Sequence, residues 1–228
     1  MDIEMDHSFS STWYPDNIVI FEKNLFSRNA IIDAVEKIYP ESNVLCFDCM
    51  AKTMRFVTGA HYLQHTSLAI IEFSGDKNSP LLFFNTMSVH FSANKKHDLK
   101  VLIYTSVEDR FFISSMAKFI SGGIVFKSEP ILSMQQVLYT LANSNSVVLS
   151  DKVSKLLESY TPKKSSCDEL RGYFSEIGEH RLSLSSRRID SKYKTFYSRR
   201  YNTIAKIGCK NVRQYSRYLS KIVGKLSE

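Results

Sequence analysis

Short apolar runs alternate with amphipathic stretches along the first two thirds of the chain, from Asn17 to about Glu158. The runs have the length of buried strands, and each is followed by a stretch in which apolar residues recur every three or four positions, as on one face of a helix. Strands that alternate with helices pair in parallel, so the pattern predicts a doubly wound α/β domain with a five-stranded parallel sheet. The predicted strands are Asn17–Phe21, Val44–Phe47, Leu68–Ile71, Val101–Tyr104 and Ile124–Phe126.

The predicted helices lie between and after these strands, and Gly122-Gly123 is predicted as a turn that leads into the last strand. They cover Phe26–Tyr39, Ala51–Leu63, Pro80–Lys95, Arg110–Ile120 and Ile131–Leu141. A further helix is predicted over Ser146–Tyr160, followed by a polar linker at Thr161–Ser166. From Cys167 onward the pattern is one of helices and turns. The sequence therefore predicts an N-terminal extension (1–15), an α/β domain (16–145), a linker helix and linker (146–166) and an all-α domain (167–228).

Positive charge is concentrated in the last third of the chain. The net charge is +7, but residues 1–161 hold 14 Lys and Arg against 17 Asp and Glu, whereas residues 162–228 hold 16 against 6. A basic final third behind a slightly acidic remainder is typical of a module that binds a polyanion such as nucleic acid. A solvated basic surface is the alternative.

Several other classes of protein lack support in this sequence. The apolar runs are far shorter than the ~20 residues of a membrane span, and the acidic N-terminus does not resemble a signal peptide. We therefore expect a cytoplasmic protein without a membrane partner. Cys46 and Cys49 have CxxC spacing but no second pair, and His61 and His65 have no obvious third ligand, so we expect no metal and no cofactor. The sequence contains no P-loop, dinucleotide-binding or nucleophile-elbow motif, so we expect no enzyme.

Polar residues follow four of the predicted strands: Glu22 and Lys23, then Glu72, Thr105 and Lys127. This arrangement resembles the receiver domain of response regulators. In that family two acidic residues follow the first strand, a phosphate-accepting Asp follows the third, a Thr or Ser follows the fourth, and a Lys follows the fifth. The resemblance implies a receiver-like fold in which carboxylates hold magnesium, the metal and the Lys neutralise the phosphoryl group, and the hydroxyl senses it.

The acidic positions of this chain depart from the receiver pattern. Lys23 places a cation where a metal ligand is needed, and Glu72 is one methylene longer than the phosphate-accepting Asp. We therefore predict a receiver that cannot be switched by phosphate. Our hypothesis is that Lys23 and Glu72, with Lys127 as a further candidate member, form an ion-paired cluster that fixes one conformation. The alternative is that these are only polar residues at strand ends.

A second resemblance lies near residue 200. The segments Lys194-Thr195-Phe196, Arg199-Arg200 and Lys206-Ile207-Gly208-Cys209-Lys210-Asn211 match the K-T-V, H-R and K-L-G-x-x-N motifs of the LuxR/FixJ (NarL-type) helix-turn-helix at the same spacing. The resemblance implies a recognition helix in the major groove of DNA, followed by a short helix that makes the dimer contact. The upstream helices, at about Asp168–Ile177 and Leu184–Ile189, match that family poorly.

The residue pattern agrees with this interpretation. On a helix from Lys192 to Ile207, apolar residues and Thr203 fall on one face, and a mixture of cations, hydroxyls and aromatic rings falls on the other. Gly208 is predicted to end this helix. Asn211 is predicted to cap the next one, with Gln214 completing a weak capping box. In the last helix apolar residues recur at three-to-four spacing: Val212, Tyr215, Leu219, Ile222 and Leu226.

These patterns assign a role to each candidate residue of the DNA interface. Base edges are predicted to be read by Lys194, Tyr197, Ser198 and Tyr201. Phosphates are predicted to be bound by Lys192, Thr195, Arg187, Arg188, Arg199, Arg200 and Lys210. By periodicity Arg200 falls nearer the core, so it either bends out to a phosphate or pairs locally.

The sequence thus predicts a cytoplasmic, nucleoid-associated transcription regulator that binds double-stranded DNA independently of phosphorylation. Within the LuxR-type family it resembles the RcsA and BglJ type of regulator. That resemblance implies a heterodimer with a second LuxR-type regulator, and a homodimer is the other possibility. The alternative function is an interaction protein that sequesters a partner regulator and binds little DNA itself.

Overall fold

The computed structural model of the chain describes residues 13–59, 65–73, 77–92, 99–144, 146–160, 164–179 and 192–227, with the backbone alone at 90–92 and 192–196. Its centre is a parallel sheet with the strand order β2-β1-β3-β4-β5-β6. The first five strands have the order of a doubly wound fold whose topology reverses between β1 and β3. The strands are β1 (Asn17–Phe21), β2 (Asn43–Phe47), β3 (Ser67–Glu72), β4 (Leu99–Thr105), β5 (Gly122–Phe126) and β6 (Val148–Leu149).

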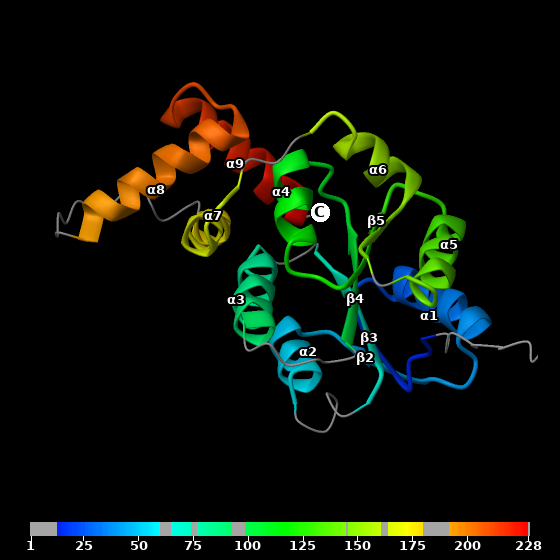
Figure 1. Cartoon of the computed structure of the whole chain (residues 1–228). Coiled ribbons are helices and arrows are strands. Elements are labelled where there is room, and N and C mark those ends of the chain that lie inside the picture. Colours follow the sequence, from blue (N-terminus) through cyan, green and yellow to red (C-terminus); the bar gives the residue numbers. More distant parts are fainter. Residues whose placement is uncertain are drawn as a thin grey trace, which may run out of the picture.

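Helices cover both faces of this sheet (Figure 1). On one face lie α1 (Leu25–Ile38) and α5 (Ile131–Leu141), and on the other lie α2 (Met50–Val57), α3 (Ser79–Ser92) and α4 (Arg110–Ala117). The alternation of side chains along β1 serves both layers, because Ile18 and Ile20 enter the α1/α5 core while Val19 and Phe21 enter the opposite core. The predicted doubly wound α/β architecture is confirmed.

The sixth strand corrects the prediction of one helix over Ser146–Tyr160. Val148 and Leu149 pair with Gly123 and Ile124 of β5, and the helix α6 is confined to Asp151–Leu157. A two-residue strand is too short to show the alternation that identifies strands in a sequence. The sheet therefore continues beyond residue 145, where the α/β domain was predicted to end.

The predicted turn at Gly122-Gly123 is also wrong, because both residues belong to β5 and pair with Val101 and Leu102. A Cβ atom on Gly122 would lie 2.1 Å from the Val101 carbonyl oxygen, and one on Gly123 would lie 2.7 Å from Val137 Cγ1. Glycine is needed here for the close approach of neighbouring elements within the sheet domain.

The C-terminal part is helical, with α7 (Cys167–Glu179), α8 (Lys192–Ile207) and α9 (Val212–Ser227). Figure 1 shows α7 between α8 and α3, and α9 running back to the sheet domain beside α4. Tyr173 and Phe174 of α7 and Tyr215 of α9 belong to the same buried cluster as the α3/α4 side of the sheet. The Phe84 and Phe174 ring centroids are 5.2 Å apart. The helical part therefore shares a core with the sheet domain.

The predicted helix at Asp168–Ile177 is confirmed within α7, whereas the one predicted at Leu184–Ile189 lies outside the described residues. Among the helices that the structure describes, none combines the length and apolar character needed to cross a membrane.

Candidate nucleic-acid interface and receiver-like pocket

Three charged side chains meet at the carboxyl-terminal ends of the strands β1, β3 and β5. The ammonium nitrogen of Lys127 lies 3.0 Å from Glu22 Oε2 and 3.1 Å from Glu72 Oε1. Both Glu side chains are 1% exposed, and that of Lys127 is 21% exposed. We call these three residues the lysine–carboxylate cluster. It places one cation between two buried carboxylates.

Local hydrogen bonds hold this cluster in place. The Asn24 N–H donates to Glu22 Oε1 over 2.8 Å, and the Ser27 hydroxyl donates to Glu22 Oε2 over 2.9 Å, so the first turn of α1 fixes the carboxylate of Glu22. Burial acts to lower the pKa of Lys127, but Glu72 and Glu22 outweigh it, and the pKa is raised overall. Lys127 is therefore charged at neutral pH.

The residues of this pocket do not fit the magnesium ion that a receiver fold implies. Two carboxylates are present, and each already accepts Lys127 as a partner. Lys23 stands at the next position of the pattern, where a third acidic ligand would be needed. No group of three potential metal ligands occurs among the described residues.

Lys23 and Thr105 lie differently from the cluster members. Lys23 is exposed and takes part in no ion pair within the described ranges, so the prediction that it belongs to the ion-paired cluster is wrong. Neighbouring side chains of extended backbone point in opposite directions, and Glu22 is the one that points inward. Thr105 is buried, and its hydroxyl oxygen accepts a hydrogen bond from the Val107 N–H at 3.1 Å.

The helix α8 exposes the side that the sequence assigned to DNA. Tyr197 and Tyr201 are 50% and 60% exposed, and Ser198 is exposed beside them. On the opposite side Thr203 and Ile204 are buried. These five side chains follow the predicted division of the helix into an outward face and a packed face.

Ion pairs attach α8 to α7. Arg199 Nη2 lies 3.0 Å from Asp168 Oδ2, and both of these side chains are about half exposed. Arg200 Nε lies 3.3 Å from Glu176 Oε2, with exposed fractions of only 20% and 12%. Arg200 also lies over the ring of Tyr215 at 5.7 Å. Of the two outcomes considered for Arg200, local pairing is the one observed.

Two further contacts strengthen the attachment of α8. Lys206 pairs with Glu169 of α7, and Asn202 donates to the same carboxylate. Burial acts to raise the pKa of Glu169, but the hydrogen bond from Lys206 and others outweigh it, so the pKa is lowered. For Glu176 burial prevails over Arg200 and raises the pKa. Charges on the inner side of α8 therefore hold the helix in place.

The turn after α8 has the predicted glycine end and the predicted Asn211 cap, but Gln214 accepts from the N–H of Lys210 and not, as a capping box requires, from that of Asn211. Gly208 has a φ of 87°, and the Cys209 N–H donates to the Ile204 carbonyl over 3.0 Å, which ends the helix as a glycine cap does. Asn211 Oδ1 accepts from the Gln214 N–H at 2.9 Å, and Gln214 Oε1 accepts from the Lys210 N–H at 2.6 Å. The side chain of Lys210 is exposed beside this turn.

Several predicted interface residues lie outside the part of the chain that the structure describes. Arg187 and Arg188 lie outside the described residues, as do the side chains of Lys192, Lys194 and Thr195. Their assignments stay predictions.

Sequence reasoning missed the contacts between α9 and the loop after β4. The Tyr218 hydroxyl donates to Asp109 Oδ1 over 2.7 Å and lies 3.0 Å from the Tyr173 hydroxyl. The Ser106 hydroxyl donates to the Lys225 carbonyl over 3.0 Å. No spacing in the sequence links these positions, because they are brought together only by the docking of the helical part.

Comparison with known proteins establishes the class of fold: a receiver-like parallel sheet followed by a helical C-terminal domain. No family model matches the chain, and no curated protein matches it. RcsB from Salmonella enterica serovar Typhimurium bound to the promoter P1flhDC, with the phosphomimetic BeF3⁻, is similar with a TM-score of 0.60 and 19% identity, over 91% of this chain and 99% of that one. A complex of the two-component response regulator RcsB with DNA is similar with a TM-score of 0.55 and 21% identity, over the same shares.

A third solved structure, of two RcsB dimers bound to two parallel DNAs, has a TM-score of 0.53 and 21% identity, again over 91% of this chain and 99% of that one. At these identities the comparisons establish a shared fold along nearly the whole chain.

Proposed function

We propose that this chain is a DNA-binding transcription regulator whose helix α8 lies in the major groove. The observation that carries the proposal is the outward face of α8, where Tyr197, Ser198 and Tyr201 stand exposed on a helix whose other side is fixed to α7. The excess of positive charge after residue 161 supplies attraction for phosphates. RcsB structures with the same fold contain promoter DNA.

The proposed regulator works without phosphorylation. The lysine–carboxylate cluster supports this part of the proposal, because Lys127 already pairs with the two carboxylates that a metal ion would need. A phosphoryl group on Glu72 would have to separate this ion pair in a buried setting. In this respect the chain resembles the RcsA and BglJ type of regulator.

The proposed DNA-bound form contains a second, different chain. Arg213, Arg217 and Lys221 recur every four residues along the exposed side of α9, over roughly 12 Å of helix. No ion pair joins them to another residue in the part of the chain that the structure describes. A two-fold homodimer through this side would bring like charges together. A heterodimer with a LuxR-type chain that presents acidic residues to α9 is therefore favoured over a homodimer.

A second candidate function is that of a protein that sequesters a partner regulator. Arg199, Arg200 and Lys206 all pair with carboxylates of α7, which reduces the positive charge that α8 offers to DNA. Under either function we propose a cytoplasmic protein that needs no cofactor and catalyses no reaction. The DNA-binding form would be nucleoid-associated.

Binding of fluorescent duplexes, selected from a random library by the purified full chain, tests the two functions. The measurement is made with and without a candidate LuxR-type partner, at several salt concentrations. The regulator predicts a sequence preference and a steep decrease of affinity with salt, with a slope of about −0.9 per phosphate contact. If the chain forms a complex with the partner and thereby abolishes the partner's own DNA binding, the result would instead support sequestration. No preference under any condition would contradict the DNA-binding proposal.

A further inference from the structure

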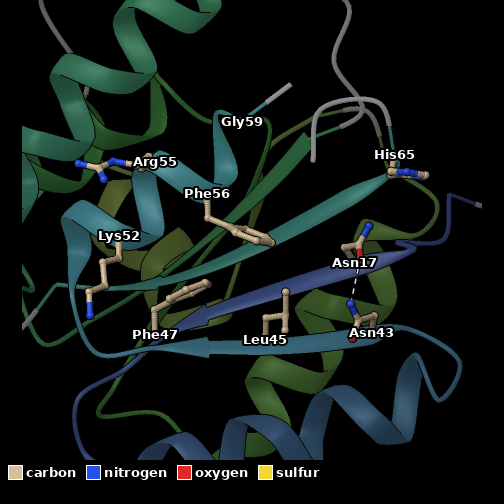
Figure 2. A pocket seen from close by; sticks show the side chains of 9 residues that line it. All are labelled: Asn17, Asn43, Leu45, Phe47, Lys52, Arg55, Phe56, Gly59 and His65. Carbon is tan, nitrogen blue, oxygen red and sulfur yellow. Dashed lines mark hydrogen bonds between the residues drawn. The ribbon is translucent and has the colours of Figure 1, made fainter. Parts of the chain in front are cut away.

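A groove of about 630 Å³ lies beside the edge strand β2, between that strand and α2 (Figure 2). Its volume is within the roughly 300–1,000 Å³ typical of small-molecule sites. None of its described lining residues belongs to the lysine–carboxylate cluster or to α8. The proposed function therefore leaves this groove unexplained.

The middle of the groove is apolar. Leu45 and Phe47 stand two residues apart on β2 and so share one face of the strand. Phe56 of α2 lies opposite them, with its ring centroid 5.3 Å from that of Phe47. Leu45 and Phe47 are partly buried and Phe56 is 38% exposed, because β2 is at the edge of the sheet and α2 has only eight residues. A ligand that covered them would remove apolar surface from water.

The two ends of the groove are polar and differ in charge. Lys52 and Arg55 of α2 line one end, where the two side chains diverge and the guanidinium of Arg55 is directed away from Phe56 (Figure 2). Neither takes part in an ion pair within the described ranges. At the other end Asn43 Nδ2 donates to Asn17 Oδ1 over 3.3 Å. From Asn43 to Phe47 the strand spans about 13 Å at roughly 3.3 Å per residue. The described lining contains no acidic residue.

We propose that this groove is a binding site for a small elongated organic anion with an apolar tail, of the class of medium-chain carboxylates. The carboxylate of the ligand pairs with Lys52, Arg55 adds a second positive charge at the same end, and the tail lies along Leu45 and Phe47 beneath Phe56. The cationic end selects against neutral and cationic molecules with the same tail. An extended peptide that adds a strand to β2 is the competing occupant, and it would use the backbone of β2 instead of these two cations.

Calorimetric titration of the full chain with decanoate tests the site, with decanol and decylamine as ligands of the same tail and different charge. We expect saturable binding of decanoate, and at least tenfold weaker binding of the other two. In the double variant Lys52→Gln/Arg55→Gln the affinity for decanoate decreases at least about tenfold, the loss of one charge-assisted hydrogen bond or more. Leu45→Gln weakens all three ligands.

The control is Lys37→Gln/Arg110→Gln, which removes two exposed cations from α1 and the start of α4 and changes the net charge equally. This variant should bind decanoate like the wild type. Equal affinity for all three ligands, or unchanged decanoate binding in Lys52→Gln/Arg55→Gln, would overturn the proposal. The absence of saturable decanoate binding would also overturn it. The same holds if an extended peptide binds to this face and decanoate does not. The DNA-binding proposal is unaffected by any of these results.

Discussion

Replacing Lys127 by Met would leave two buried carboxylates without their cation. Lys127 lies 3.0 Å and 3.1 Å from Glu22 and Glu72, whose side chains are each 1% exposed. Removal of one partner of a buried ion pair costs about 3–5 kcal/mol. Because 21% of the Lys127 side chain is exposed, water offsets part of this cost. We expect Lys127→Met to lower the free energy of unfolding by about 2–4 kcal/mol at pH 7.

The pH dependence of this effect identifies its cause. In the wild type the folded-state pKa of Lys127 is raised. The contribution of the ion pair to folding stability is therefore complete below the unfolded-state pKa of about 10.4. It is lost only as the pH rises through the folded-state pKa. In the variant the two neighbouring carboxylates repel each other in a buried site, which favours their protonation. The stability deficit of the variant should therefore shrink between pH 7 and pH 5.

Urea unfolding at pH 5 and pH 7, followed by circular dichroism and by the fluorescence of the single tryptophan, Trp13, measures the effect. Lys152→Met is the matched control, because Lys152 and Glu108 pair at 2.6 Å with exposed fractions of 45% and 38%. That exposed pair should contribute less than about 1 kcal/mol. The double variant Glu72→Gln/Lys127→Met should recover part of the lost stability. A deficit below about 1 kcal/mol for Lys127→Met, or one that does not change with pH, would refute a buried cluster held by this lysine.

Four further predictions concern phosphorylation, DNA binding and the docking of the helices. Acetyl phosphate with magnesium should add no stable phosphoryl group to Glu72, and intact-protein mass spectrometry would detect an adduct that contradicts this. Tyr201→Ala should weaken specific duplex binding by about 1–3 kcal/mol, measured by fluorescence anisotropy, without loss of stability. The control Tyr139→Ala removes a tyrosine of α5 that is 69% exposed, and it should not change duplex binding. Arg200→Ala should lower the free energy of unfolding by about 1–3 kcal/mol, because it breaks an ion pair that is shielded from water. Arg199→Ala breaks a half-exposed pair and should lower it by no more than about 0.5 kcal/mol. Equal losses of the two variants in urea unfolding would contradict this prediction. Tyr218→Phe should cost about 1.5–3 kcal/mol through its hydrogen bond to Asp109, measured in the same way, and a loss under ~0.5 would mean that the bond contributes little.

Local patterns in the sequence predicted the elements that depend on neighbouring residues. The five main strands, the extent of α5 and α8, the cap at Gly208 and the role of Asn211 all follow from periodicity or from the conformations that these residues prefer. The cluster at the sheet edge was predicted in part. The hypothesis paired Lys23 with Glu72 and had Lys127 only as a further candidate member, whereas Lys127 pairs with Glu72 and Glu22. The bounds of β1 were predicted correctly, but the inward position of Glu22 depends on its hydrogen bonds with the turn into α1, which strand periodicity does not show.

Features that depend on distant parts of the chain were not predictable in this way. The ion pair of Arg200 with Glu176 joins two helices, and the groove at β2 is lined by side chains of β2 and α2 that no spacing in the sequence links. The helix α2 ends at Val57, whereas the prediction ended near Leu63, and residues 60–63 lie outside the described residues. The shared core of α7, α9 and the sheet domain was missed for the same reason. Tyr173, Phe174 and Tyr215 have the spacing of residues that pack within a helical domain, and the sequence does not indicate that their partners include Phe84 and Phe111.

The loop after β4 connects the lysine–carboxylate cluster to the helical part. In the receiver family the position of Thr105 senses the phosphoryl group, and here its hydroxyl oxygen accepts the Val107 N–H instead. Ser106 and Asp109 of the same loop hold α9, through the Lys225 carbonyl and the Tyr218 hydroxyl. The Lys127 N–H also donates to the Thr105 carbonyl over 2.9 Å, so the loop that touches α9 is hydrogen-bonded to the residue that pairs with Glu22 and Glu72. The lysine–carboxylate cluster and the contacts of α9 are therefore joined through one loop by hydrogen bonds, which supports the proposal of a regulator that needs no phosphate.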